Sequence, residues 1–158
     1  MANRIMLNET SYHGAGAVRE IAAEAKARGY KKAFVCSDPD LIKFGVTAKV
    51  TDVLDNAELA YEIYSDIKAN PTIENVQHGV QAFKDAEADY IIAIGGGSSM
   101  DCAKAAGARI VKPRQSIRQM RGLLKVHRRL PLLIAVPTRA GTGSETTLAA
   151  VITDSEKH

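Results

Sequence analysis

The sequence contains no Trp, and aromatic residues make up only 5% of its 158 residues. A hydrophobic core must therefore be built mainly from aliphatic side chains. Only two cysteines are present, which is too few for a disulfide framework. Cys36 ends an apolar run and Cys102 lies among small residues. We therefore expect two buried thiols in a reducing compartment.

Long hydrophobic runs are also missing. No apolar stretch reaches the ~18 residues that a membrane-spanning helix needs. The first four residues lack the apolar region of a signal peptide. These absences predict no membrane partner and a cytoplasmic location. A content of 46% hydrophobic and 25% charged residues is typical of a globular protein, and we expect residues 1–158 to form one domain.

Acidic residues are absent from residue 102 to residue 144, where ten Lys or Arg residues occur. The rest of the chain carries 11 basic and 18 acidic residues, so the net charge of +3 hides an uneven distribution. Such a basic segment could attract phosphates, nucleic acid or an acidic partner. It contains almost no aromatic residues to stack on bases, so a solvated loop and helix face is the plainer interpretation, and nucleic-acid binding is not expected.

The hydrophobic pattern alternates along the chain between that of strands and that of helices. Short apolar runs predict strands, and apolar residues three or four positions apart predict helices. Strands separated by helices of ten or more residues indicate βαβ units, so the fold class is α/β with a mostly parallel sheet. We expect strands at residues 4–8, 32–37, 59–64, 90–94, 132–136 and 148–152, and helices at residues 17–28, 46–56, 73–86 and 100–111.

A glycine-rich loop follows the predicted strand at residues 90–94. In parallel α/β sheets, ligands bind beyond the carboxyl ends of the strands. Glycines let the backbone approach a ligand closely, and the free N–H groups of the next helix suit a pyrophosphate. The sequence leaves two interpretations of Asp101 open: contact with the ligand, or a capping box in which Ser98 is the N-cap.

Two other loops at predicted strand ends have residues suited to a nucleotide. Residues 137–145 combine glycines with hydroxyl groups that can bind phosphate or ribose oxygens; alternatively, they form a plain loop in which Thr142 and Glu145 are a capping pair. Asp38 could accept hydrogen bonds from ribose hydroxyls and repel a 2′-phosphate, which would select NAD over NADP. An Asp before a proline, here Pro39, more often only starts a turn.

Together these segments resemble the iron-containing alcohol dehydrogenase family, and in particular its branch of lactaldehyde reductases and butanol dehydrogenases. The similar stretches are GGGSSMDCAK at residues 95–104, VPTRAGTGSET at residues 136–146, and Asn70-Pro71-Thr72, with the opening RIMLNETSYHGAGA and the closing VITDSEKH. The resemblance implies a Rossmann-like NAD-binding N-terminal domain, with the helical metal-binding domain absent. It also implies hydride transfer between NAD(H) and a small alcohol or aldehyde.

The resemblance further implies which residues hold the dinucleotide. Asp38 would select the ribose, the glycine loop would cover the pyrophosphate, and residues 138, 142 and 151 would lie near the nicotinamide. No catalytic or metal-binding residue is expected. The expected cofactor-binding residues are Asp38, Asn70, Gly95, Gly96, Gly97, Ser98, Asp101, Thr138, Arg139, Gly141, Thr142 and Val151.

Two features depart from the family pattern. The family has Thr where this chain has Arg139, whose guanidinium could pair with a phosphate or fill space that the nicotinamide needs. The basic segment at residues 112–129 replaces a connection that carries acidic residues in the family. The family's iron is held by one Asp and three His of the helical domain, so iron is expected only with that domain. Asp154 and His158 match the spacing of its first ligand pair, which we interpret as coincidence.

Two kinds of function therefore remain open on the sequence. One is an oxidoreductase domain that binds NAD(H) but is inactive alone, because the metal that polarises the substrate oxygen is missing. The alternative is a truncated or diverged chain that serves as a non-catalytic binding or self-assembling module. In that case, apolar surface that normally faces the second domain would drive self-association.

Overall fold

The computed structural model describes residues 10–122, 130–147 and 150–155. Its sheet has four strands: β1 (Lys32–Ser37), β2 (Ala60–Tyr64), β3 (Tyr90–Gly95) and β4 (Leu133–Pro137). They lie in the order β2-β1-β3-β4, and every neighbouring pair is parallel. The predicted α/β class with a parallel sheet is confirmed.

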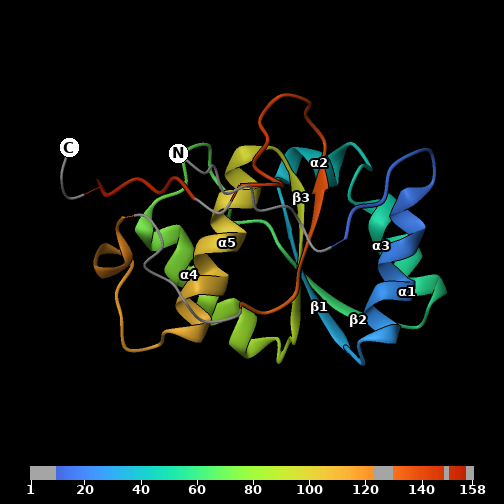
Figure 1. The fold of residues 1–158 in the computed structure, drawn as a ribbon, viewed down its shortest axis with the longest axis horizontal. Helices are drawn as coiled ribbons and strands as arrows, with labels where there is room; N and C mark the ends of the chain where they lie inside the picture. The colour runs from blue at the N-terminus through green and yellow to red at the C-terminus, as the bar shows by residue number, and fades with distance from the viewer. Residues whose placement is uncertain (1–9, 123–129, 148–149, 156–158) are drawn as a thin grey trace, which may run out of the picture.

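Helices cover both faces of this sheet. The short elements are η1 (Ala17–Arg19), α2 (Pro39–Lys43) and η2 (Arg118–Met120), and the longer helices are α1 (Glu20–Ala27), α3 (Ala48–Asn56), α4 (Ile73–Asp85) and α5 (Gly97–Val111). Figure 1 shows α1 and α3 on one face of the sheet and α4 and α5 on the other, with α2 at the end where the strands point. The arrangement is that of a doubly wound sheet.

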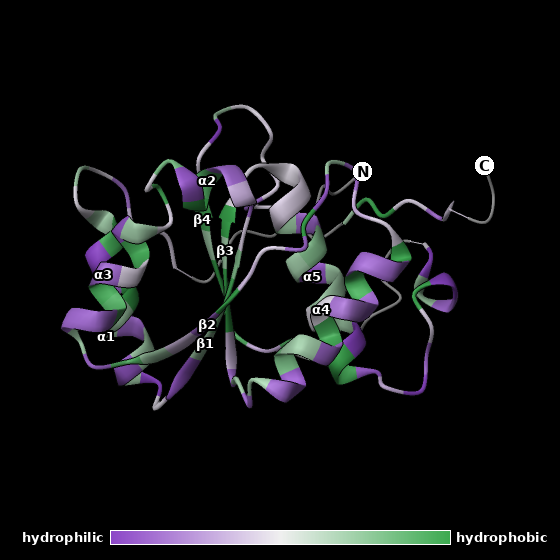
Figure 2. Cartoon of the chain, turned by 180° about the vertical axis from the view of Figure 1, so that it is seen from behind, coloured by the Kyte–Doolittle hydropathy of each residue, from purple (hydrophilic) through white to green (hydrophobic). Residues whose placement is uncertain are grey.

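The core consists of two layers, one on each side of the sheet. Alternate residues of β3 face opposite layers: Ile91 and Ala93 pack with residues of α4 and α5, whereas Ile92 and Ile94 pack with residues of α1 and α3. This is why an uninterrupted apolar run, rather than an alternating one, forms the strand. Figure 2 shows the hydrophobic residues concentrated along the central strands, while the flanking helices carry both hydrophobic and hydrophilic residues.

Most predicted elements are confirmed, and two require correction. α5 begins three residues before the predicted helix at residues 100–111. The strand predicted at residues 148–152 is wrong for residues 150–152, since the described part of that segment has no strand; Thr153 instead forms an isolated parallel bridge with Thr72. The backbone there is held by the start of α4 and not by a sheet edge. Residues 148–149 and the strand predicted at residues 4–8 lie outside the described residues.

Both cysteines are buried, as predicted. Burial raises the pKa of the Cys36 thiol well above its ordinary value, and burial likewise raises the pKa of Cys102 to about 11. Both side chains are therefore neutral in the folded protein at physiological pH. Within the described residues, none of the helices has the length and apolar character needed to cross a membrane.

The raised thiol pKa predicts a loss of stability at alkaline pH. In the unfolded chain, Cys102 ionises near its ordinary pKa of about 8.5, whereas the folded protein keeps this proton up to about pH 11. Its contribution to stability is complete below the unfolded pKa and declines as the pH rises toward the folded one. We expect Cys102 to account for a loss of about 1 kcal/mol in unfolding free energy between pH 9 and 10.

Urea denaturation at a series of pH values measures this decline. Cys102→Ala removes the titrating group and should flatten the decline by the stated amount. A variant whose stability falls as steeply as that of the parent chain would contradict the assignment.

Candidate functional site

The strand order creates a crevice at the carboxyl ends of β1 and β3. These strands are neighbours, but the chain leaves them in opposite directions. After β1 it passes through α2 and α3 to β2 at one edge, and after β3 it passes through α5 to β4 at the other. The point where the connections diverge is where doubly wound sheets bind their ligands. Asp38 and the glycine loop follow directly from these two strands.

The glycine loop joins the end of β3 to the start of α5 with almost no intervening chain. Gly95 has a φ of +142°, and a Cβ added there would lie 2.5 Å from the hydroxyl oxygen of Ser99. Gly96 is the N-cap of α5 and provides no side-chain cap. The first N–H groups of a 15-residue helix therefore open onto this loop. Their partial positive charge suits a phosphate group.

The predicted capping box of Ser98 and Asp101 is wrong. Because α5 begins at Gly97, both residues lie within its first turns and neither can be at the N-cap. The Asp101 carboxylate instead accepts a hydrogen bond from the N–H of Val151 at 3.1 Å. Its other oxygen lies 3.8 Å from the ammonium of Lys104. Asp101 thus ties the segment at residues 150–155 to α5.

The loop after β4 packs against the same helix end. The Thr138 N–H donates to the carbonyl oxygen of Gly95 at 3.0 Å. The Ser144 hydroxyl oxygen lies 3.3 Å from the position that a Cβ of Gly97 would occupy. The two loops that the sequence analysis singled out are therefore side by side, as predicted.

Lys104 fastens the far end of this loop. Its ammonium donates to the Ser144 carbonyl and to the Thr147 hydroxyl at 2.9 Å. Burial lowers the pKa of Lys104, while Asp101 and Glu145 act in the opposite direction. The sequence analysis missed this residue, although its place one turn after Asp101, within the same motif, puts both on one helix face.

Thr142 does not form the capping pair with Glu145 that was considered as an alternative. Its hydroxyl oxygen accepts from the N–H of Ser144 at 3.5 Å. No helix follows in residues 144–147. Thr138, Arg139, Gly141 and Thr142 are all exposed, so the loop presents its backbone and hydroxyl groups to solvent at the crevice.

Asp38 occupies the position expected of a residue that starts a turn. It is the N-cap of α2, and its Oδ1 accepts from the N–H of Asp40 at 2.8 Å. A carboxylate can accept several hydrogen bonds, so this contact leaves capacity for a ribose hydroxyl. The Leu41 side chain lies 3.4 Å from the Cβ position of Gly95, so α2 is directly beside the glycine loop.

Asn70 and Val151 belong to two segments that run side by side. Asn70 is exposed with a φ of +57°, and Val151 is 76% exposed. The Thr153 N–H donates to the Pro71 carbonyl at 2.9 Å, and its carbonyl accepts from Ile73 at 3.2 Å. The structure therefore brings both predicted residues to the amino-terminal ends of α4 and α5.

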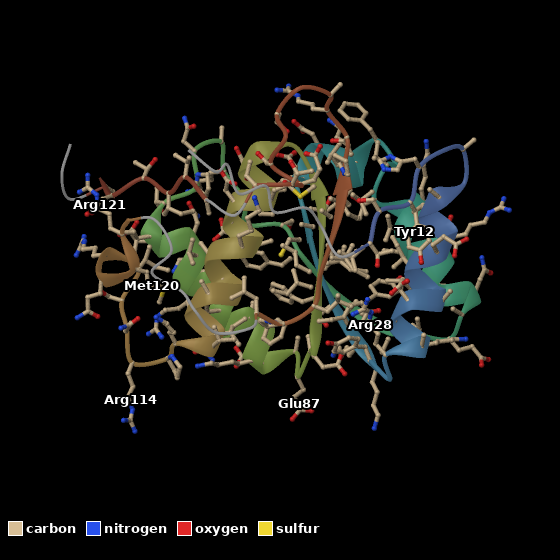
Figure 3. All side chains as sticks on the ribbon, in the orientation of Figure 1. Tyr12, Arg28, Glu87, Arg114, Met120 and Arg121 are labelled. Atoms are coloured by element: carbon tan, nitrogen blue, oxygen red, sulfur yellow. The ribbon has the colours of Figure 1, made fainter. Side chains whose placement is uncertain are left out.

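The basic segment divides into two parts. Arg114 and Arg121 are exposed and project from the outer side of the molecule, away from the glycine loop (Figure 3). Arg118 is paired with the Asp154 carboxylate at 2.9 Å. Of the basic residues described between residues 102 and 144, Lys104 and Arg139 contact the site. Most of the segment is a solvated surface, in agreement with the plainer interpretation.

Comparison with known proteins identifies the family. Residues 8–158 match the family described as iron-containing alcohol dehydrogenase. The chain belongs to this family. It is 46% identical over 158 residues to the lactaldehyde reductase of Escherichia coli (strain K12), an alignment that covers 99% of this chain and 41% of that protein.

Solved structures of alcohol dehydrogenase relatives have the same fold. A 1,3-propanediol oxidoreductase superposes with a TM-score of 0.94 at 29% identity, covering 99% of this chain and 41% of its own. A sulfoacetaldehyde reductase from Bifidobacterium kashiwanohense, solved in complex with NAD+, superposes with a TM-score of 0.77 at 28% identity, covering 91% and 38%. The chain spans about 41% of the length of the E. coli relative.

The iron of the family name finds no ligand set in residues 10–122, 130–147 and 150–155. That part of the chain has no group of three or more His, Cys, Asp or Glu side chains placed to hold a metal ion. The Asp154 carboxylate, one half of the pair with metal-ligand spacing, accepts hydrogen bonds from Arg118, and His158 lies outside the described residues. We therefore derive no chemical step through iron for these residues.

Proposed function

We propose that this chain is the NAD(H)-binding part of an iron-containing alcohol dehydrogenase. The observation that supports this most strongly is the convergence of three strand-end segments at the crevice between β1 and β3. Asp38, the glycine loop and the loop after β4 surround the open amino-terminal end of α5. The NAD+ complex of the sulfoacetaldehyde reductase supports the choice of ligand.

Each part of the dinucleotide would meet groups suited to it. The pyrophosphate would lie over Gly95 and Gly96, where it accepts hydrogen bonds from the first N–H groups of α5. The adenosine ribose would donate its hydroxyls to the free lone pairs of Asp38. Asn70, Thr138, Thr142 and Val151 would lie around the nicotinamide, close to the segment that Asp101 holds in place.

The reaction that we propose for the complete enzyme is hydride transfer between nicotinamide and the carbon that bears the oxygen of a small alcohol or aldehyde. In this reaction the chain binds and orients the nicotinamide ring. A metal in such an enzyme polarises the substrate oxygen as a Lewis acid. The described residues provide no ligands for one, so we expect no turnover by this chain alone. The assay is NADH oxidation with a short aldehyde and added Fe²⁺ or Zn²⁺.

Substitution of Asp38 by Asn tests the proposed selection of NAD. The carboxylate would repel a 2′-phosphate, so the parent chain should bind NAD+ at least about ten times more tightly than NADP+. Asp38→Asn removes the charge and should reduce this preference by about tenfold. Asn is as good an N-cap as Asp, so the unfolding free energy should change by less than about 0.5 kcal/mol.

Calorimetric titration with both dinucleotides measures the preference, and urea denaturation controls for the cap of α2. If Asp38→Asn leaves the ratio of the two affinities unchanged, Asp38 acts only as a helix cap. If the parent chain binds neither dinucleotide, the proposed function is wrong.

Self-association and a cytoplasmic location stay predictions. Phe44 is 73% exposed and Val151 is 76% exposed, and apolar side chains left open to water favour association. Light scattering at several salt concentrations tests the alternative of a self-assembling module, because association through apolar contacts persists at high salt whereas association through the basic segment is screened. A monodisperse monomer that binds NAD+ would favour the NAD(H)-binding function.

A further inference from the structure

The Arg139 side chain lies across the amino-terminal end of α5. Its Cδ is 3.5 Å and its Cγ 4.0 Å from the position that a Cβ of Gly96 would occupy. The aliphatic stem of Arg139 therefore rests on the N-cap residue of the helix. We propose that Arg139 is a pyrophosphate-binding residue, which increases the affinity of this chain for dinucleotides through the charge of their phosphates. This inference rests on the proposed function.

The backbone beside Arg139 is fixed on both sides. The preceding residue, Thr138, donates its N–H to the carbonyl of Gly95 at 3.0 Å. Further along the loop, Ser144 and Thr147 are bonded to the Lys104 ammonium. Arg139 therefore starts from a defined position at the strand end and covers a residue that has no side chain of its own. A larger residue at position 96 would occupy the space into which the Arg139 stem packs.

The charge of Arg139 is not neutralised within the described part of the chain. Arg139 is exposed, and none of the ion pairs found among these residues includes it. The amino-terminal end of α5 adds a partial positive charge at the same place. A guanidinium and helix N–H groups on one spot repel each other unless an anion lies between them. A pyrophosphate satisfies both, and Arg can bind it in a bidentate manner.

The position of Arg139 favours the pyrophosphate over the 2′-phosphate of NADP. The ribose-selecting residue Asp38 follows β1, and Arg139 follows β4, with β3 between the two strands. The contact of Arg139 is with Gly96, at the end of β3 and the start of α5. That is where the centre of the dinucleotide would lie, and not its adenosine end.

Substitutions of Arg139 separate this role from obstruction of the nicotinamide. Three ligands are titrated calorimetrically: ADP-ribose, which has the pyrophosphate without nicotinamide, NAD+, and adenosine, which has neither. Arg139→Thr should lower the affinities for ADP-ribose and NAD+ by about tenfold each and leave adenosine binding unchanged. Arg139→Lys keeps the charge without the planar fork and should lose about threefold. The salt dependence of ADP-ribose binding should be weaker in Arg139→Thr than in Arg139→Lys.

The outcomes distinguish the inference from the proposed function. If Arg139→Thr binds NAD+ more tightly and ADP-ribose as before, the side chain obstructs the nicotinamide and the inference is wrong. If all variants bind ADP-ribose equally, Arg139 has no role in affinity, although the proposed function stands. If the parent chain and Arg139→Thr both fail to bind ADP-ribose and NAD+, both proposals fail. Arg139 is exposed, so circular dichroism of the variants should match the parent chain.

Discussion

Gly95→Ala should lower the free energy of unfolding by about 3 kcal/mol. The added Cβ would lie 2.5 Å from the Ser99 hydroxyl oxygen and 3.0 Å from the Ser99 Cβ. Ser99 is only 3% exposed, so it cannot move away into solvent. In addition, the φ of +142° at position 95 is unfavourable for any residue with a side chain. Overpacking and backbone strain therefore act together at the end of β3.

Gly96→Ala is the matched control for this prediction. Gly96 has a φ of −95°, and the nearest atom to an added Cβ is the Arg139 Cδ at 3.5 Å, an ordinary contact with a flexible side chain. We expect a change below about 1 kcal/mol, measured by urea denaturation followed by circular dichroism. The double variant Gly95→Ala, Ser99→Ala removes the atom at the shortest distance and should recover part of the loss. Equal destabilisation by Gly95→Ala and Gly96→Ala would contradict the steric argument.

The strands could be predicted from the sequence because burial on both faces leaves a clear pattern. β3 is apolar at consecutive positions since Ile91 and Ile92 face different core layers, and no surface helix has such a run. The start of α5 was harder. Its N-cap, Gly96, has no side-chain cap, and glycine has little preference for helix. Contacts of the helix end with Arg139 and Ser144 come from a loop about 40 residues later in the chain, which local sequence cannot reveal.

The candidate site could be predicted in part. Since the carboxyl ends of parallel strands meet at one edge of a sheet, loops rich in glycine and hydroxyl groups after two strands had to lie near each other. The strand order, which puts Asp38 and Gly95 on either side of the crevice, is a property of the whole chain. The same holds for the segment at residues 150–155, whose hydrophobic pattern resembles that of a strand but whose position is set by Asp101 and by the start of α4.

Asp101→Ala should lower the free energy of unfolding by about 2 kcal/mol. The substitution removes the acceptor for the Val151 N–H and takes the nearest carboxylate away from Lys104, whose side chain is only 11% exposed. Lys104→Met should reduce the cost of Asp101→Ala to about 1 kcal/mol, because no ammonium is then left without its carboxylate. Urea denaturation of the two single variants and the double variant gives the coupling. Additive effects would show that the charge pair contributes nothing.

Asp101→Asn separates the structural role of this carboxylate from contact with the dinucleotide. The amide oxygen can still accept from Val151, so the segment at residues 150–155 stays on α5, and the charge paired with Lys104 is lost. If Asp101 acts by positioning, NAD+ affinity should change by less than about threefold in Asp101→Asn and fall about tenfold in Asp101→Ala, where the nicotinamide end of the site is no longer held. An equal loss of NAD+ affinity in both variants, without a matching loss of stability in Asp101→Asn, would instead show that the carboxylate contacts the ligand.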